Sequence, residues 1–182
     1  MSTILDAGGK VRKLKVFCGF PTVHYQVHSG HIIQAVTLGY AMAANAQRFG
    51  FAGVVDCDIN PVEVARDVLL DSALRAEADW LFMCDADTFV AARRKSDPVG
   101  ANILQMIDTG ETSGAAVIAA PVRMRKRTDG YNVWGVQPVK QGPNGESRVI
   151  PLHLGPEHFR GKVSRVTRIG SAFMAINLNW IR

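Results

Sequence analysis

Apolar and polar residues follow one another in blocks that predict alternating strands and helices. The clearest block runs from Trp80 to Cys84, where five apolar residues stand between Asp79 and Asp85. The run is too short for a helix and is typical of a strand buried on both faces, as in a parallel sheet covered by helices. This strand is the feature around which we expect the fold to form.

The chain before this strand predicts two strand–helix repeats. We expect a strand over 15–20 that stops at Pro21, a helix over 31–49, a strand over 51–57 and a helix over 60–78. Asn60 is predicted to cap the second helix, with Pro61 at its first position. The apolar stripe predicted for the first helix contains Ile32, Ala35, Val36, Gly39, Met42, Ala43 and Ala46. The second helix is predicted to bury Val64, Val68, Leu69 and Ala73, or their neighbours.

The later part of the chain predicts a different pattern. A third helix should begin at Asp97-Pro98, carry Ile103, Leu104 and Ile107, and end at Gly110 or Gly114. An apolar strand over 115–120 follows, then short antiparallel strands over 133–139, 148–152 and 163–169, and a last strand over 173–176. The predicted fold class is α/β, with a mostly parallel sheet flanked by helices and a mixed antiparallel C-terminal region. Residues 1–14 form a loose lead-in, and 15–182 a single domain.

Composition is that of an ordinary globular protein, with 47% hydrophobic and 20% charged residues among 182. No apolar run approaches the roughly 20 residues of a membrane span, and the N-terminus lacks the apolar core of a signal peptide. Cys18, Cys57 and Cys84 lie in or beside apolar runs without metal-ligand spacing. We therefore predict reduced, buried thiols and a cytoplasmic protein.

The formal net charge of +5 and the pI near 9.4 favour anionic partners such as nucleotides or nucleic acid. The positive charge is concentrated in two runs, 93–95 and 123–127. A basic run is more often a solvated loop than a nucleic-acid patch, and no aromatic residues are interleaved with either one.

Two carboxylates, Asp85 and Asp87, follow the central strand directly. Ligands of open α/β sheets gather at the carboxyl ends of the strands, and residues i and i+2 of an extended chain point to the same side. The two aspartates could thus share a divalent cation, for which oxygen ligands favour Mg²⁺ or Mn²⁺. The alternative is a helix cap or a solvated turn, since Asp is common in both.

These blocks resemble, in order and spacing, the nucleotide-binding half of GT-A glycosyltransferases, in particular small phage-type members. The resemblance covers roughly residues 15–178. It rests on the first strand ending at Pro21, on Ala65-Arg66-Asp67 in a helix, on Asp85-Ala86-Asp87, and on the segments 119–123 and 170–176.

The resemblance implies a donor site. Asp87 would bind Mn²⁺ or Mg²⁺ at the diphosphate of a nucleotide sugar, and Asp85 would approach the ribose or the metal's water shell. Arg66 would lie near the diphosphate or the sugar, which suits an arginine fork; the alternative is a surface pair with Glu63 or Asp67. The first-strand exit, Gly19-Phe20-Pro21-Thr22, would lie under the base, although Gly19 could equally serve close packing.

The predicted function is therefore metal-dependent transfer of a sugar from a nucleotide-diphosphate donor to an acceptor such as a modified DNA base or a glycan. For a phage-encoded enzyme this would occur in the host cytoplasm.

The catalytic residue is unknown; Asp129, Glu157 and His158 qualify as a base by residue type only. Either a C-terminal portion is absent or the acceptor half is minimal. The alternatives are a non-catalytic nucleotide-binding module and a basic nucleic-acid-binding protein. A haloacid-dehalogenase-like phosphatase fits poorly, because Phe89 stands where that motif has Thr or Val.

Overall fold

The computed structural model describes residues 9, 12–22, 29–86, 88, 99–120, 122, 133–136, 151–153 and 166–182. These residues belong to two compact units, Met1–Ile118 with Ala172–Arg182, and Ala119–Ser171. Within the described ranges, no helix has both the length and the apolar character that a bilayer span requires.

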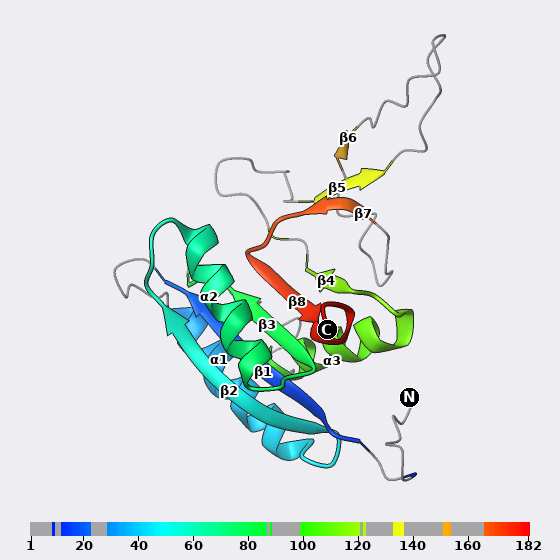
Figure 1. Ribbon diagram of the computed structural model, residues 1–182. Helices are drawn as coiled ribbons and strands as arrows, with labels where there is room; N and C mark the ends of the chain where they lie inside the picture. Colours follow the sequence, from blue (N-terminus) through cyan, green and yellow to red (C-terminus); the bar gives the residue numbers. More distant parts are fainter. Residues whose placement is uncertain are drawn as a thin grey trace. The chain divides into compact units, whose positions relative to one another are not determined.

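The first unit contains a five-stranded sheet and three helices (Figure 1). Its elements in chain order are β1 (Leu14–Pro21), α1 (Ser29–Ala44), β2 (Phe49–Cys57), α2 (Val62–Arg75), β3 (Trp80–Cys84), α3 (Val99–Ser113), β4 (Val117–Ala119), β8 (Phe173–Asn177) and the 3₁₀ turn η2 (Leu178–Trp180). The strand order is β2-β1-β3-β8-β4. The α/β class predicted from the sequence is confirmed.

The sheet is mixed, so the prediction of a mostly parallel sheet is only partly supported. β1 runs parallel to β2 and to β3, whereas β8 pairs antiparallel with β3 from Trp80–Asn177 to Cys84–Phe173. The sequence indicated the last strand but not its partner. Because β8 enters between β3 and β4, a strand from the end of the chain lies inside the sheet.

Helix α2 covers one face of the sheet through a narrow apolar stripe. Ala65, Leu69 and Ala73 are fully buried against β1 and β3. A Cβ atom added to Gly19 on β1 would lie 3.0 Å from Leu69 Cδ1. Gly19 thus allows the helix to approach the strand closely, as the packing alternative for this residue proposed. Val64 and Val68, which were also predicted to be buried, are largely exposed.

Helices α1 and α3 lie on the other face (Figure 1). The prediction that Ile103, Leu104 and Ile107 form the core face of α3 is confirmed, since all three are buried. Gly110 lies within this helix and packs on the Trp80 indole, where an added Cβ would be 2.4 Å from Cη2. Gly114 ends the helix with φ of +63°, a conformation that favours glycine.

The predicted core face of α1 is largely wrong. The buried residues are Gln34, Leu38, Ala41 and Met42, whereas Ile32 and Val36 are 53% and 68% exposed. The helix contains no charged residue and is apolar nearly all round. Periodicity alone could therefore not distinguish the face that packs on the sheet from the face that does not.

Several predicted boundaries also shift. Helix α1 ends at Ala44, before the predicted 49, because Asn45 bonds back to the Ala41 carbonyl through Nδ2 (2.8 Å) and Phe49 already pairs with Leu14. Asn60 is not the cap of α2; Pro61 occupies that position, without a side-chain cap bond. β4 is shorter than predicted and partly exposed.

The second unit contains an antiparallel sheet of β5 (Val133–Val136), β6 (Pro151–His153) and β7 (Val166–Ile169), in the order β6-β5-β7. Trp134 pairs with His153 on one side and with Arg168 on the other. The three strands lie in or overlap the predicted ranges, so the mixed antiparallel C-terminal region is confirmed for the described residues.

Candidate functional site

The strand order of the main sheet reverses direction at β1. From β1 the chain passes through α1 to β2 on one side, and from β2 through α2 to β3 on the other side of β1. The two helices lie on opposite faces of the sheet (Figure 1). In open α/β sheets, a crevice forms outside the carboxyl ends of the strands at such a reversal. Here the reversal falls between β1 and β3, whose carboxyl ends are followed by Thr22 and Asp85.

An ion pair between Asp85 and Arg66 closes this edge on the α2 side. Arg66 Nη2 donates to Asp85 Oδ1 at 2.8 Å and to Oδ2 at 3.0 Å. Both side chains are about three-quarters buried or more, with exposed fractions of 20% for Arg66 and 26% for Asp85. Arg66 thus lies beside Asp85; its predicted place near a diphosphate or sugar stays a prediction. The alternative partners Glu63 and Asp67 are not the residues with which Arg66 pairs.

The chain turns immediately after β3. The Asp85 amide donates to the Ala172 carbonyl (2.9 Å), the Ala86 amide to the Pro21 carbonyl (3.3 Å), and the Thr88 amide back to the Asp85 carbonyl (2.8 Å). The extended geometry assumed for the two aspartates thus stops at Asp85. Asp87 itself lies outside the described residues.

The buried thiol of Cys84 forms a hydrogen bond with this turn. Cys84 Sγ lies 3.1 Å from the Thr88 carbonyl oxygen, to which it donates. Gln34 Nε2 of α1 in turn donates to Cys84 Sγ at 3.2 Å, and Gln34 is almost completely buried. The sequence analysis assigned no role to Gln34. A long polar side chain in an otherwise apolar, uncharged helix was the signal that could have identified it.

The first-strand exit is divided between the core and the ligand edge. Phe20 is buried and packs edge-on against Phe82, with ring centroids 6.5 Å apart, so it lies in the core. Pro21 is paired with Cys57 and offers its carbonyl to Ala86. Thr22 lies at the end of the strand and donates its amide to the Cys57 carbonyl at 3.0 Å. Of the three predicted donor-binding residues at this exit, Thr22 is the one that follows the carboxyl end of β1.

Two buried polar atoms at this edge have no hydrogen-bond partner among the described residues. They are Thr22 Oγ1 and Arg66 Nε. Buried polar groups are normally hydrogen-bonded, so these two atoms are candidates for contact with a ligand. Together the two atoms offer one hydroxyl and one cationic N–H donor, which suit the oxygen atoms of an anionic, oxygen-rich ligand.

Cys57 adds a weakly acidic thiol to the same edge. Burial raises its pKa, and the neighbouring carboxylates of Asp56 and Asp58 raise it further. The thiol is therefore kept neutral at physiological pH, which argues against a role as a nucleophile. All three cysteines are free and buried, as predicted.

The described residues do not by themselves fit a divalent ion. Both oxygens of Asp85 already accept from Arg66, and no group of three His, Cys, Asp or Glu side chains in the described ranges could hold a metal. A site for Mn²⁺ or Mg²⁺ would need Asp87, which lies outside these ranges. The candidate bases Asp129, Glu157 and His158 and the basic runs 93–95 and 123–127 also lie outside them.

Comparisons with known proteins leave the family open. No protein-family model matches the sequence, and no curated protein is significantly similar to it. Among solved structures, the chain is similar to the crystal structure of A197 from STIV, with 15% sequence identity and a TM-score of 0.49. The match covers 92% of this chain and 66% of that chain, so this chain spans just under two thirds of its length. At this level of likeness we draw no functional conclusion from it.

Proposed function

We propose that this chain is a GT-A-like glycosyltransferase that binds a nucleotide-diphosphate sugar at the crevice between β1 and β3, with the help of a divalent ion. The observation that carries the proposal is the Arg66–Asp85 pair at the point where the strand order reverses. A cation held at this edge suits a ligand whose negative charge is concentrated in a diphosphate.

Arg66 is prepared for this ligand by its partner. Asp85 holds the guanidinium through Nη2, and Nε is a buried donor without a partner among the described residues. An arginine fixed in this way can donate to a phosphate oxygen without first losing rotamer freedom. The Thr22 hydroxyl, also buried and unpaired, would accept or donate one hydrogen bond at the same crevice.

The divalent ion enters the proposal through Asp87, with Asp85 as its neighbour. Such an ion would neutralise the charge that builds on the departing diphosphate. The residues of this chain would bind the donor, orient it over the ends of β1 and β3, and exclude water from the buried part of the crevice. The acceptor is open, with a modified DNA base or a glycan as the candidates.

A thermal-shift panel of UDP-, GDP-, CDP- and TDP-sugars, each with Mn²⁺ and with EDTA, tests the donor site. A ligand at about 100 times its dissociation constant adds about 2.7 kcal/mol to the free energy of unfolding. We expect one base to stabilise the protein in Mn²⁺ but not in EDTA, and Asp87→Ala to remove that difference. Stabilisation by no nucleotide sugar under any condition would refute the donor site.

The variant Arg66→Ala tests whether Arg66 binds the diphosphate rather than the nucleoside part of the donor. We expect it to weaken nucleotide diphosphates at least tenfold and nucleosides little, because the lost contact is a charge-assisted hydrogen bond. Arg75→Ala is the matched control, since Arg75 lies on the same helix in an exposed pair with Asp71. Equal losses for nucleoside and diphosphate would remove the proposed role of Arg66.

The same ligands distinguish the alternatives. Nucleotide-sugar binding without hydrolysis or transfer to any acceptor would indicate a non-catalytic nucleotide-binding module. Affinity for DNA or RNA that falls steeply with salt and does not depend on Mn²⁺ would indicate a nucleic-acid-binding protein.

A further inference from the structure

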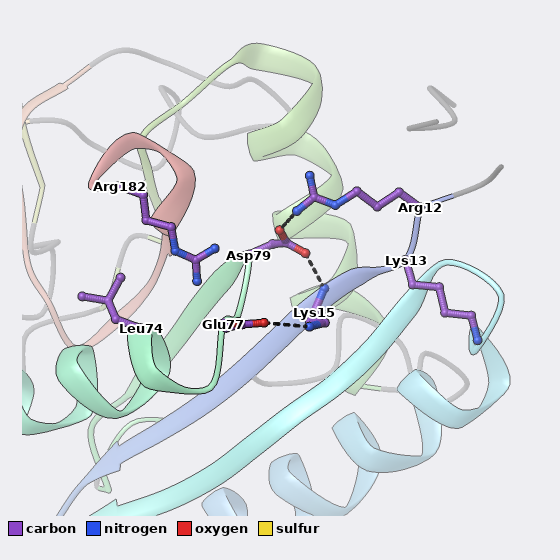
Figure 2. Close-up of a pocket in the computed structure, with 7 residues that line it drawn as sticks. All are labelled: Arg12, Lys13, Lys15, Leu74, Glu77, Asp79 and Arg182. Carbon is purple, nitrogen blue, oxygen red and sulfur yellow. Dashed lines mark hydrogen bonds and ion pairs between the residues drawn. The ribbon is translucent and has the colours of Figure 1, made fainter. Parts of the chain in front are cut away.

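A pocket of about 580 Å³ lies at the amino-terminal edge of the main sheet (Figure 2). Its lining includes residues just before and within the start of β1, the connection from α2 to β3, and the residue that follows η2 by two positions. They are the basic residues Arg12, Lys13, Lys15 and Arg182, the acidic residues Glu77 and Asp79, and Leu74.

This pocket is separate from the crevice at Arg66 and Asp85. β1 begins at Leu14, beside the pocket, and ends at Pro21, beside the crevice. The seven steps between its first and last residue, at about 3.3 Å each, place the two edges roughly 23 Å apart along the strand. A ligand in the pocket would therefore not contact the proposed donor site, and the inference below does not rest on the proposed function.

The negative charge of Asp79 is neutralised by contacts within the protein. Its side chain is almost completely buried, where it accepts from the Arg12 guanidinium and from the Lys15 amide at 2.8 Å. Its own backbone joins β1 and η2, because its amide donates to the Lys15 carbonyl and its carbonyl accepts from the Leu178 amide, both at 2.8 Å. Asp79 is thus a structural tie that also holds Arg12 at the pocket.

Glu77 neutralises little of the positive charge of the basic residues that line the pocket. Its side chain is 80% exposed, and its Oε2 lies 3.8 Å from Lys15 Nζ, which is itself about half exposed. Exposed pairs at this separation are weak because water screens them.

Two cations remain without an acidic partner among the described residues. Lys13 has no ion pair there, and Arg182 Nη2 donates only to the Ala78 carbonyl, at 3.1 Å. That bond directs the Arg182 guanidinium toward the pocket, where it and the Arg12 guanidinium approach from opposite sides of Asp79 (Figure 2). Each arginine retains further N–H donors, since a guanidinium carries five.

We propose that this pocket binds a small anion with two or more phosphate groups, such as an oligophosphate. Its volume falls within the range of about 300–1,000 Å³ that is usual for small-ligand sites and exceeds the need of a single phosphate. Arginine forks and lysine ammonium groups are the side chains that recognise phosphate. The described residues that line the pocket include no aromatic side chain, so phosphates rather than stacked bases are expected to supply the contacts, which disfavours single-stranded nucleic acid.

Calorimetric titration of the full chain with inorganic triphosphate tests the proposal. We expect Lys13→Gln and Arg182→Gln each to weaken binding about tenfold or more, since each removes a charged contact to phosphate. Arg182→Lys should retain most of the affinity. Arg75→Gln, which removes a charge from α2 outside the pocket, should change the affinity less than twofold.

Three results would overturn the proposal. An equal loss in Arg75→Gln would reduce the effect to general attraction by a basic protein. A loss in Arg66→Ala with none in Lys13→Gln would place the triphosphate at the crevice instead. Tighter binding of a single-stranded oligonucleotide with the same dependence on Lys13 and Arg182 would replace the small anion by nucleic acid. Lys13→Gln decides the matter if Arg182→Gln unfolds, because Lys13 is exposed and precedes β1.

Discussion

Two side chains at the carboxyl edge of the sheet lower the stability of the ligand-free protein. Thr22 is buried and its hydroxyl has no partner among the described residues, and the same holds for Arg66 Nε. A group of this kind destabilises the free protein, because its hydrogen bond to water is lost and not replaced. This cost is expected of a residue that would contact the ligand proposed above.

Thr22→Val should therefore raise the free energy of unfolding of the ligand-free protein by about 1 kcal/mol, because it removes an unsatisfied hydroxyl at nearly constant shape. The control is Thr37→Val, where the hydroxyl donates to the Gln34 carbonyl at 3.1 Å, so its loss should be neutral or destabilising. Urea denaturation measures both. A drop in stability for Thr22→Val would mean that the hydroxyl has a structural partner.

Cys18 predicts a dependence of stability on alkaline pH. Burial raises the pKa of its thiol from 9.0 to about 12. The unfolded chain loses this proton near pH 9 while the folded protein keeps it, so the stabilising contribution is complete below pH 9 and is lost as the pH rises from 9 to 12. The loss is at most about 1.4 kcal/mol per pH unit. Urea unfolding at pH 8, 9 and 10 should show a smaller slope in Cys18→Ala, and an unchanged slope would contradict this account.

At the scale of elements, α1 and α2 differ in how clearly their sequences indicate which face packs on the sheet. Helix α2 is amphipathic, with charged residues away from a stripe of three buried ones. Helix α1 has no charge, and its outward face carries exposed residues such as Val36 and Tyr40. Packing on the sheet, not the polarity of the helix, therefore determines which side of α1 is buried.

Neighbouring positions on α2 should differ sharply in their effect on stability. Leu69→Ala should lower the free energy of unfolding by about 2–5 kcal/mol, since Leu69 is fully buried against Gly19 and its truncation leaves a cavity. Val68→Ala should cost less than about 1 kcal/mol because Val68 is 38% exposed. Urea denaturation measures both, and similar losses would show that α2 packs differently.

At the scale of the whole molecule, the main sheet is completed by the end of the chain. β8 lies between β3 and β4, although the segment 120–172 separates it from β4 in sequence. The Asn177 amide donates to the Ala116 carbonyl at 2.8 Å, which places the end of β8 beside the start of β4. The end of β4 and the start of β8 therefore lie close together.

A chain in which residues 120–170 are replaced by a Gly/Ser linker of about eight residues should still fold. The first unit keeps its five strands and three helices, and the linker joins neighbouring strands that are about 4.8 Å apart. Far-UV circular dichroism and a single cooperative urea transition are the expected results. A chain without cooperative unfolding would show that the first unit needs the second one.

The sequence by itself determined the elements that carry strong local signals. The apolar run of β3, the core face of α3, the glycine that ends α3 and the antiparallel strands of the second unit follow from hydrophobic pattern and backbone preference. The resemblance to GT-A glycosyltransferases also assigned Arg66 and Asp85 to one donor site, which stays a prediction. Only the tertiary structure decided which face of α1 is buried, where β8 lies in the sheet and that Arg66 pairs with Asp85. These depend on contacts between residues far apart in the chain, which local periodicity does not encode.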